Sequence, residues 1–373
     1  MKKINIFFLI FSFLNLILFE KKSLSKDLSE LKVLHLSFHS GCISDFEFVA
    51  NQIGINLTSL NVLAMPRQDW DEKSPGASIY NIGHDRAKRI WDKKKEYFDQ
   101  FDIILTSDIA PLSRIFLQNG WDKPLIVWIC NRFDYYDGAT NDCGFPDNEY
   151  YNLIKNSLKN HKVKVIPNAS FEILYASTKN INLTESVIKP IGAILFEKIE
   201  SSIPHNINKS NKFYIPPYII NTEFVKTEQN CKNAGINVYC GRYGSKKELS
   251  EFKGIIHMPY QWSNFAFFQD IYTGLVHFVP SQNFIRNLMH GSYWHANANF
   301  MHDPNNFKYS EWYSQDNEAA IIYFDSWKKQ KNKTETINFE SLKPKIKQFA
   351  QDHQTKTLIQ WKNVFDELSQ YCN

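Results

Sequence analysis

Short apolar runs alternate with helically spaced apolar residues along the first half of the chain. Lys32–Phe38 (KVLHLSF) has the pattern of a buried strand, and Phe46 and Val49 follow it at a helical spacing. Further strand-like runs occupy Leu60–Ala64, Phe101–Thr106, Leu125–Cys130, Val163–Pro167 and Val187–Ile191. Because strands alternate with helical segments, we predict a parallel sheet wound with helices.

A polar stretch separates this series from a second one. Residues 200–212 (ESSIPHNINKSNK) show no apolar periodicity, which is typical of a linker. Strand-like runs then resume at Lys212–Ile215, Asn237–Cys240, Gly254–His257, Gly274–Val279 and Ile321–Phe324, with a helix predicted over Phe265–Tyr272. Leu342–Leu368 has long helical spacing, and we expect this helix to pack across both halves.

The length of the chain also favours two domains. A chain of 373 residues exceeds the size at which one hydrophobic core stops growing. We therefore divide it into a leader (1–26), a first α/β domain (27–195), a linker (196–211), a second α/β domain (212–335) and a C-terminal helical segment (336–373).

The N-terminus has the features of a targeting segment. Lys2 and Lys3 precede an uncharged run over residues 4–19, which Glu20 and Lys21 end. This run is longer than a typical signal-peptide core and shorter than a full membrane span, so a cleaved signal peptide and a membrane anchor both remain open. Either one predicts a protein of the secretory pathway or a membrane-anchored protein, with membrane contact through residues 4–19.

Composition excludes several classes of partner. The net charge of +4 comes from 43 basic and 39 acidic side chains without a long basic block, so no nucleic-acid partner is predicted. The six cysteines include no CxxC pair and no matching histidine spacing. We therefore predict neither a metal site nor a permanently bound cofactor.

The stretch 252–281 of the second half suits nucleotide binding. Its strand ends in Met258-Pro259-Tyr260, and Ser263 is the expected N-cap of the next helix, whose free N–H groups would bind a diphosphate. Gln269 and Asp270 could hydrogen-bond a ribose or sugar hydroxyl, and Gly274 would permit close approach. The alternative is that these residues only cap and connect elements, as they do in any α/β protein.

Basic residues follow a neighbouring strand. The sequence CGRYGSKK places Arg242, Lys246 and Lys247 in a glycine-rich loop after the strand NVYC. Such side chains could neutralise the negative charge of a departing nucleoside diphosphate. A solvated basic turn is the competing interpretation.

The loop after the first strand carries a candidate base. His39 is suited to deprotonating an acceptor hydroxyl, Asp45 could orient the imidazole or act alone, and Gly41 lies in the same loop. A base acting in this way would lead to inversion at the anomeric carbon. The alternative role for His39 is a backbone hydrogen bond at the strand end.

Two further strand ends carry polar groups. Asp108 ends FDIILTSD, and Arg132 and Asp134 follow LIVWIC. Charged groups next to a buried strand must be paired or face a cleft, so we predict that these groups line a binding cleft. A structural pair between Arg132 and Asp134 is the alternative.

Ser263, Gln269 and Gly274 resemble the donor-binding stretch of GT-B glycosyltransferases, where a small hydroxyl residue, a helical glutamate and a glycine recur; Gln269 stands where that family usually has Glu. The resemblance implies two Rossmann-like doubly wound α/β domains facing each other, with the acceptor on the first and the nucleotide on the second. It further implies transfer of a sugar from a nucleotide sugar to a hydroxyl acceptor on a glycan, lipid or protein. A sugar-nucleotide epimerase of the same fold and a non-catalytic carbohydrate-binding or scaffold protein are the alternatives.

Overall fold

The computed structural model describes residues 26–65, 70, 82–131, 133–134, 147–192, 211–218, 220–288 and 303–372. The predicted leader lies outside these ranges except for Lys26, as does the predicted linker except for Asn211. Within the described ranges, no helix combines the length and the apolar character needed to cross a bilayer.

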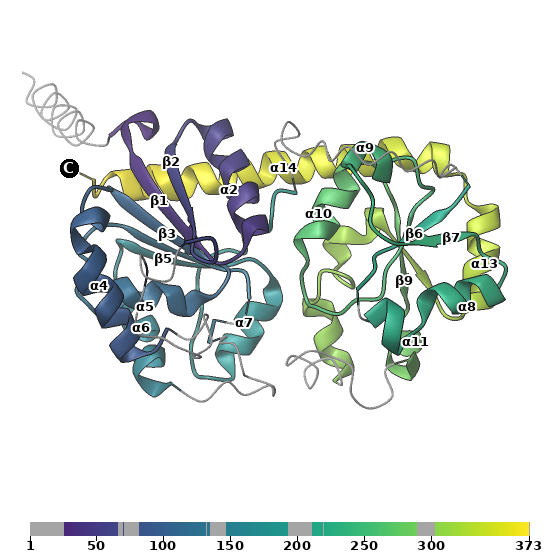
Figure 1. Ribbon diagram of the computed structural model, residues 1–373, viewed down its shortest axis with the longest axis horizontal. Coiled ribbons are helices and arrows are strands. Elements are labelled where there is room, and N and C mark those ends of the chain that lie inside the picture. Colours follow the sequence, from purple (N-terminus) through teal and green to yellow (C-terminus); the bar gives the residue numbers. More distant parts are fainter. Residues whose placement is uncertain are drawn as a thin grey trace, which may run out of the picture.

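The first half is a five-stranded sheet in the order β2-β1-β3-β4-β5, and all neighbouring strands pair in parallel. Its strands are β1 (Lys32–Ser37), β2 (Asn56–Asn61), β3 (Ile103–Ser107), β4 (Leu125–Ile129) and β5 (Val163–Pro167). Its helices are α2 (Ser40–Ile53), α4 (His84–Phe98), α5 (Arg114–Leu117), α6 (Asn148–Ser157) and α7 (Ser170–Ser177). Figure 1 shows helices on both faces of this sheet, as a doubly wound fold requires.

The second half repeats the same design. Its sheet has the order β10-β9-β8-β6-β7, again wholly parallel, which is the strand order of the first half when counted within the domain. The strands are β6 (Phe213–Ile215), β7 (Val238–Cys240), β8 (Ile255–Ile256), β9 (His277–Pro280) and β10 (Ile321–Phe324). The helices are α8 (Thr227–Asn233), α9 (Lys246–Leu249), α10 (Phe265–Tyr272), α11 (Gln282–Leu288) and α13 (Trp327–Thr336).

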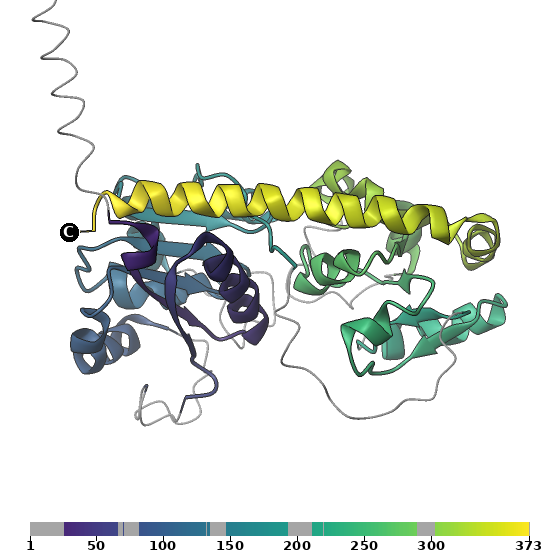
Figure 2. The ribbon, with the colours of Figure 1, turned by 90° about the horizontal axis from the view of Figure 1, so that it is seen from above.

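One long helix belongs to both halves. Helix α14 (Phe339–Ser369) runs along the first and the second domain (Figures 1 and 2). Near its C-terminal end, Trp361 packs edge-on against Phe46 of α2, with ring centroids 5.0 Å apart. Near its N-terminal end, Ile346 and Ala350 are buried in the other core. The predicted fold class is confirmed, including the C-terminal helix that crosses between the domains.

Two predicted strands differ from the structure. β2 lies at Asn56–Asn61 rather than at Leu60–Ala64, because an edge strand needs no continuous apolar run. Val187–Ile191 forms no strand. Its backbone is bound by side chains instead: Gln360 donates to the Val187 carbonyl at 3.1 Å and His353 Nε2 bonds the Pro190 carbonyl at 2.7 Å.

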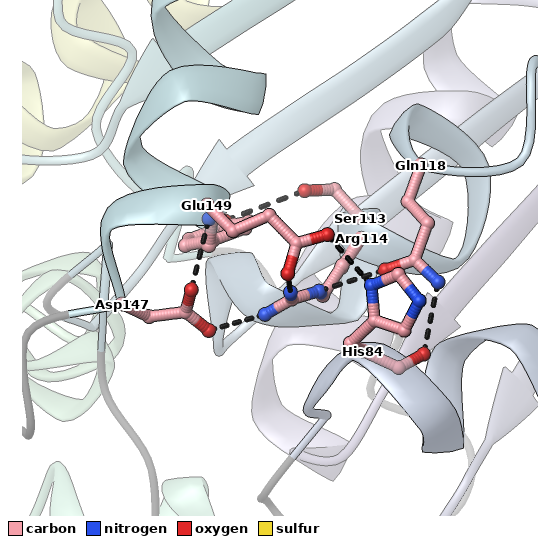
Figure 3. A network of polar contacts seen from close by, with 7 residues as sticks. His84, Ser113, Arg114, Gln118, Asp147 and Glu149 are labelled. Atoms are coloured by element: carbon pink, nitrogen blue, oxygen red, sulfur yellow. Dashed lines mark hydrogen bonds and ion pairs between the residues drawn. The ribbon is translucent and has the colours of Figure 1, made fainter.

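A buried arginine ties three helices of the first domain together (Figure 3). The guanidinium of Arg114, 2% exposed, donates to Asp147, to Glu149 at 2.7 Å and to Gln118 at 2.9 Å. Glu149 also bonds His84 Nδ1 at 2.6 Å. Because its guanidinium binds all of these partners, Arg114 links α4, α5 and α6, and we assign it a structural role.

The chain crosses between the domains at a tightly held point. Both carboxylate oxygens of the buried Asp45 accept backbone N–H groups, from Ile191 at 3.0 Å and from Gly192 at 2.9 Å. Gly192 has a φ of +75°, and a Cβ built there would overlap the backbone carbonyl of Phe268 in α10. Only glycine therefore fits where the first domain meets the second.

We expect Gly192→Ala to destabilise the protein more than Gly120→Ala. Both glycines have left-handed backbone, φ +75° and +76°, so each alanine costs about 1–2 kcal/mol of strain. At Gly120 nothing lies within 4 Å of the added carbon, whereas at Gly192 the overlap with Phe268 adds about 1–3 kcal/mol. Urea unfolding of the two variants measures the difference, and equal losses would show that the junction is loosely packed.

Candidate active site

In doubly wound sheets, ligands bind where the strand order reverses, at the carboxyl ends of the strands. The strand orders place these switch points between β1 and β3 in the first domain and between β6 and β8 in the second. His39 and Asp108 follow β1 and β3, while Tyr218 and His257 follow β6 and β8. Three of the predicted site residues therefore lie at a switch point. His39 and Asp108 lie at the first one, and Tyr260 lies at the second.

His39 begins the helix that leaves the first switch point. It is the N-cap of α2, and its Nδ1 accepts the backbone N–H of Gly41 at 3.0 Å. In this arrangement a neutral ring carries its proton on Nε2, so that nitrogen is a donor rather than a proton acceptor. The structure thus supports the alternative role of His39, a backbone hydrogen bond at a strand end, more than the role of base.

Asp108 has the properties of a proton acceptor. Its φ of +71° is unusual for a residue other than glycine, and such backbone conformations concentrate at functional sites. Burial raises the pKa of Asp108 to about 6, although the charge of His39 opposes this rise. The Asp108 carboxylate in turn helps to raise the pKa of His39, after the larger effect of a hydrogen bond with the Cys42 thiol.

Aromatic and amide side chains surround the second switch point. The rings of Tyr218 and Tyr260 lie 4.9 Å apart, and that of His257 lies 6.4 Å from Tyr218. The Tyr260 hydroxyl accepts a hydrogen bond from the Asn264 amide at 2.9 Å. Asn264 is also the N-cap of α10, where its side-chain oxygen accepts the Ala266 N–H, so the predicted cap at Ser263 is wrong by one residue.

A buried ion pair lies beside these tyrosines. Lys246 Nζ is 2.8 Å from Asp270 Oδ1, both side chains are at most 10% exposed, and the ammonium lies 5.4 Å from the ring centre of Tyr243. Burial disfavours the charged form of Lys246, but the Asp270 carboxylate more than offsets it and the pKa of Lys246 is raised. The Lys246 and Asp270 charges also act on Tyr218, so these residues form one cluster.

The two switch points adjoin across the domain boundary. The ring centroid of His39 lies 6.2 Å from that of Phe265, the first residue of α10, and Trp128 of β4 packs edge-on against the same ring at 5.7 Å. Phe265 directly follows Asn264, which bonds Tyr260. Aromatic groups from both domains therefore come together at this boundary.

A cavity of about 860 Å³ continues the crevice toward β9 and β10. Residues that follow three strand ends line it: Ser170 after β5, Ser281 after β9 and Asp325 after β10. Its volume lies within the range of small-molecule sites. Residues that follow strands of both sheets thus line this cavity.

Several predicted site residues lie elsewhere or are exposed. Asp45 holds the domain junction rather than His39, and the buried Asp134 accepts the hydroxyls of Tyr151 and Tyr175. Gly274, φ +83°, lies at the far end of α10, where a Cβ would meet Lys343 of α14, so the close approach there is made by a helix.

Three predicted donor-binding residues of the second domain are not buried. Arg242 and Lys247 are exposed, and Gln269 is half-buried on α10. Arg132 lies outside the described residues. In the described ranges, no group of three or more His, Cys, Asp or Glu side chains is close enough to hold a metal ion.

Sequence reasoning missed Tyr218, and it did not separate Lys246 from Lys247 or Asp270 from Gln269. Lys246 and Lys247 are consecutive and chemically alike, and only the direction of the four-residue helix α9 turns the first one inward. Asp270 follows the predicted Gln269, and helical phase alone decides which of the two is buried. Tyr218 could have been found from its position just after a predicted strand.

No family model matches the chain, and no curated protein is similar to it in sequence. Solved structures with a similar fold include a Listeria monocytogenes protein described as a UDP-N-acetylglucosamine 2-epimerase, with 9% identity and a TM-score of 0.43 over 86% of this chain and 91% of that one. Anabaena HepE in complex with UDP and glucose has 10% identity and a TM-score of 0.39 over 88% and 95% of the two chains. Arabidopsis thaliana UGT89C1 in complex with UDP-L-rhamnose has 9% identity and a TM-score of 0.38 over 89% and 93%. At these identities the likeness concerns the fold alone.

We expect Asp270→Asn to destabilise the protein by about 3–5 kcal/mol, because it leaves the Lys246 ammonium buried without a countercharge. Asp92→Asn is the matched control, since the Lys88–Asp92 pair is more than half exposed at both ends and should cost about 0.5 kcal/mol or less. Urea unfolding measures both. Similar small losses in the two variants would contradict a buried, charged pair at this site.

Proposed function

We propose that the protein transfers a sugar from a nucleotide sugar to a hydroxyl acceptor. The observation that carries this proposal is the meeting of the two switch points, since His39 and Asp108 of one domain adjoin the Tyr218–Tyr260 cluster of the other through Phe265. A reaction between two bound molecules needs two binding surfaces that face one space. This arrangement supplies one surface from each domain.

Asp108 is the proposed general base. Its ionised carboxylate takes the proton of the acceptor hydroxyl while that oxygen forms a bond to the anomeric carbon. The bond from this carbon to the phosphate oxygen breaks, and the electron pair leaves with the nucleoside diphosphate. A carboxyl with a pKa near 6 is ionised at neutral pH and still basic enough for this step. Attack from the side opposite the leaving group inverts the anomeric configuration.

The second domain is proposed to hold the donor. Tyr218 and Tyr260 offer ring surfaces for the nucleoside or the sugar, and the ammonium of Lys246 is the nearest buried positive charge. The exposed side chain of Arg242 follows β7 at the same edge of the sheet, where it can approach the departing diphosphate. Closure of the crevice around both substrates would exclude water and so favour transfer over hydrolysis.

We expect Asp108→Asn to lower kcat for transfer by about 10²–10⁴-fold, because the amide cannot accept the proton. Donor binding should persist, since Asp108 belongs to the other domain. The measurement combines release of free nucleotide in the presence of acceptor with the rise in melting temperature caused by nucleotide sugars such as UDP-glucose or GDP-mannose. Asp122→Asn, at an exposed carboxylate of the same domain, should leave both readouts unchanged.

Two results would count against this assignment. Full activity of the Asp108→Asn variant would exclude Asp108 as the base. Nucleotide release that is independent of any acceptor would favour epimerase or hydrolase chemistry instead.

The pH profile gives a separate prediction. Because the base must be ionised, activity should rise as the pH passes through about 6 and then level off. The charge of His39 lowers the pKa of Asp108, so His39→Asn, which keeps a capping side chain and removes the charge, should move this rise to higher pH. Transfer rates at saturating substrate from pH 4.5 to 8.5 measure the shift. A shift to lower pH would contradict the proposed interaction.

A further inference from the structure

The cavity of about 860 Å³ beside the switch points has a lining unlike a phosphate site. Three carboxylates line it, Asp316, Glu318 and Asp325, against the single ammonium of Lys308. Two lysines nearby are already bound: Lys189 to Glu311 and Asp316, and Lys329 to Asp325. The cavity therefore has no surplus positive charge to offer a phosphate, sulfate or carboxylate ligand.

Tyrosine rings form part of the same wall. Tyr313 and Tyr323 stack with their centroids 5.7 Å apart and their planes 10° apart. Each hydroxyl donates to a backbone carbonyl at 2.9 Å, Tyr313 to Pro280 and Tyr323 to Trp312. Both hydroxyls are bound in this way and Tyr313 is only 8% exposed, so the half-buried Tyr323 is the residue that offers a ligand fixed ring surface, which costs little entropy to use.

Polar groups that suit hydroxyl ligands complete the lining. Ser281 and Lys329 lower the pKa of Asp325, so its carboxylate is ionised and can accept hydrogen bonds from hydroxyls. Burial and the nearby Glu318 carboxylate raise the pKa of Tyr323 to about 12, so its phenol stays neutral. Gln282 and Asn283 add amides that both donate and accept.

The cavity also adjoins the proposed reaction space. Ser170 contributes to its wall from the first domain, and the next residue, Phe171, stacks on Trp262 with ring centroids 3.7 Å apart. Trp262 lies between Tyr260 and Asn264 of the second switch point in the sequence. A chain of sugars in the cavity could thus extend one end toward Asp108.

We propose that this cavity binds the acceptor, and that the acceptor is an uncharged oligosaccharide of which one ring lies against Tyr323, supported from behind by Tyr313, and whose hydroxyls bind Asp325 and Glu318. This inference rests on the proposed function, which it deepens by naming the acceptor class. It places the acceptor largely on the second domain, whereas the sequence predicted loops of the first.

Calorimetric titration of the full-length chain tests the proposal. The probes are two neutral tetrasaccharides, maltotetraose and chitotetraose, and a sulfated tetrasaccharide derived from heparin. We expect at least one neutral probe to bind at least tenfold more tightly than the sulfated one. Failure of both neutral probes to bind, or tighter binding of the sulfated probe, would overturn the proposal.

Variants locate the site. Tyr323→Ala removes the ring and should weaken neutral binding at least tenfold, whereas Tyr323→Phe keeps the ring and should stay within about threefold of the unchanged protein. Glu318→Lys changes an exposed side chain, so folding is not at risk, and should reduce the preference for neutral over sulfated probe. Unchanged binding in both Tyr323→Ala and Glu318→Lys would place the ligand elsewhere.

The outcome can be separated from that of the proposed function. The same variants are tested for the rise in melting temperature with UDP-glucose and GDP-mannose, which should be preserved because neither residue lies at the second switch point. If a nucleotide sugar stabilises the chain and no neutral oligosaccharide binds, the acceptor inference alone fails. If no nucleotide sugar stabilises it, the proposed function fails.

Discussion

The relative position of the two domains depends on how the segment Val187–Gly192 is held. Asp45 binds its last two N–H groups, His353 and Gln360 of α14 bind its carbonyls, and α10 lies so close to Gly192 that a side chain would not fit. Hydrogen bonds to a charged acceptor are worth about 1.5–3 kcal/mol each. Burial raises the pKa of Asp45 to about 7, because removing the carboxylate from water at the domain junction disfavours its charged form.

Other contacts between the domains act together with this segment. Helix α14 joins both cores and sets the distance between the sheets, while Lys189 adds a bridge to Glu311 at 2.9 Å across the boundary. The switch points then meet at His39 and Phe265. Burial also raises the pKa of Asp108, which follows β3 at the first of these switch points, to about 6.

Charged residues in this protein divide into two groups that the sequence does not distinguish. Arg114, Lys246 and Lys189 are buried and bound to carboxylates, which makes them part of the fold. Arg242 and Lys247 are exposed. A diphosphate would need cations that are not already neutralised, whereas a neutral sugar chain needs ring surface and hydrogen-bond acceptors. The second domain provides exposed cations in the loop and helix that follow β7, and it provides ring surface and hydrogen-bond acceptors in the cavity beside β9 and β10.

The sequence by itself determined the fold class, because the alternation of apolar runs with helical spacing is a local property that each segment carries. It correctly predicted β5, α10 and β10 to the residue, and it identified the strand ends bearing His39, Asp108 and Tyr260. The tertiary structure alone decided which polar residues share a site. The position of each residue around its helix buries Lys246 rather than Lys247 and points Asp270 into the protein. Asp45 hydrogen-bonds the backbone of the domain junction instead of His39. The role of Lys246 depends on its contact with Asp270, 24 positions away, and that of Asp45 on its contact with Gly192, 147 positions away. Local patterns in the sequence do not encode such contacts.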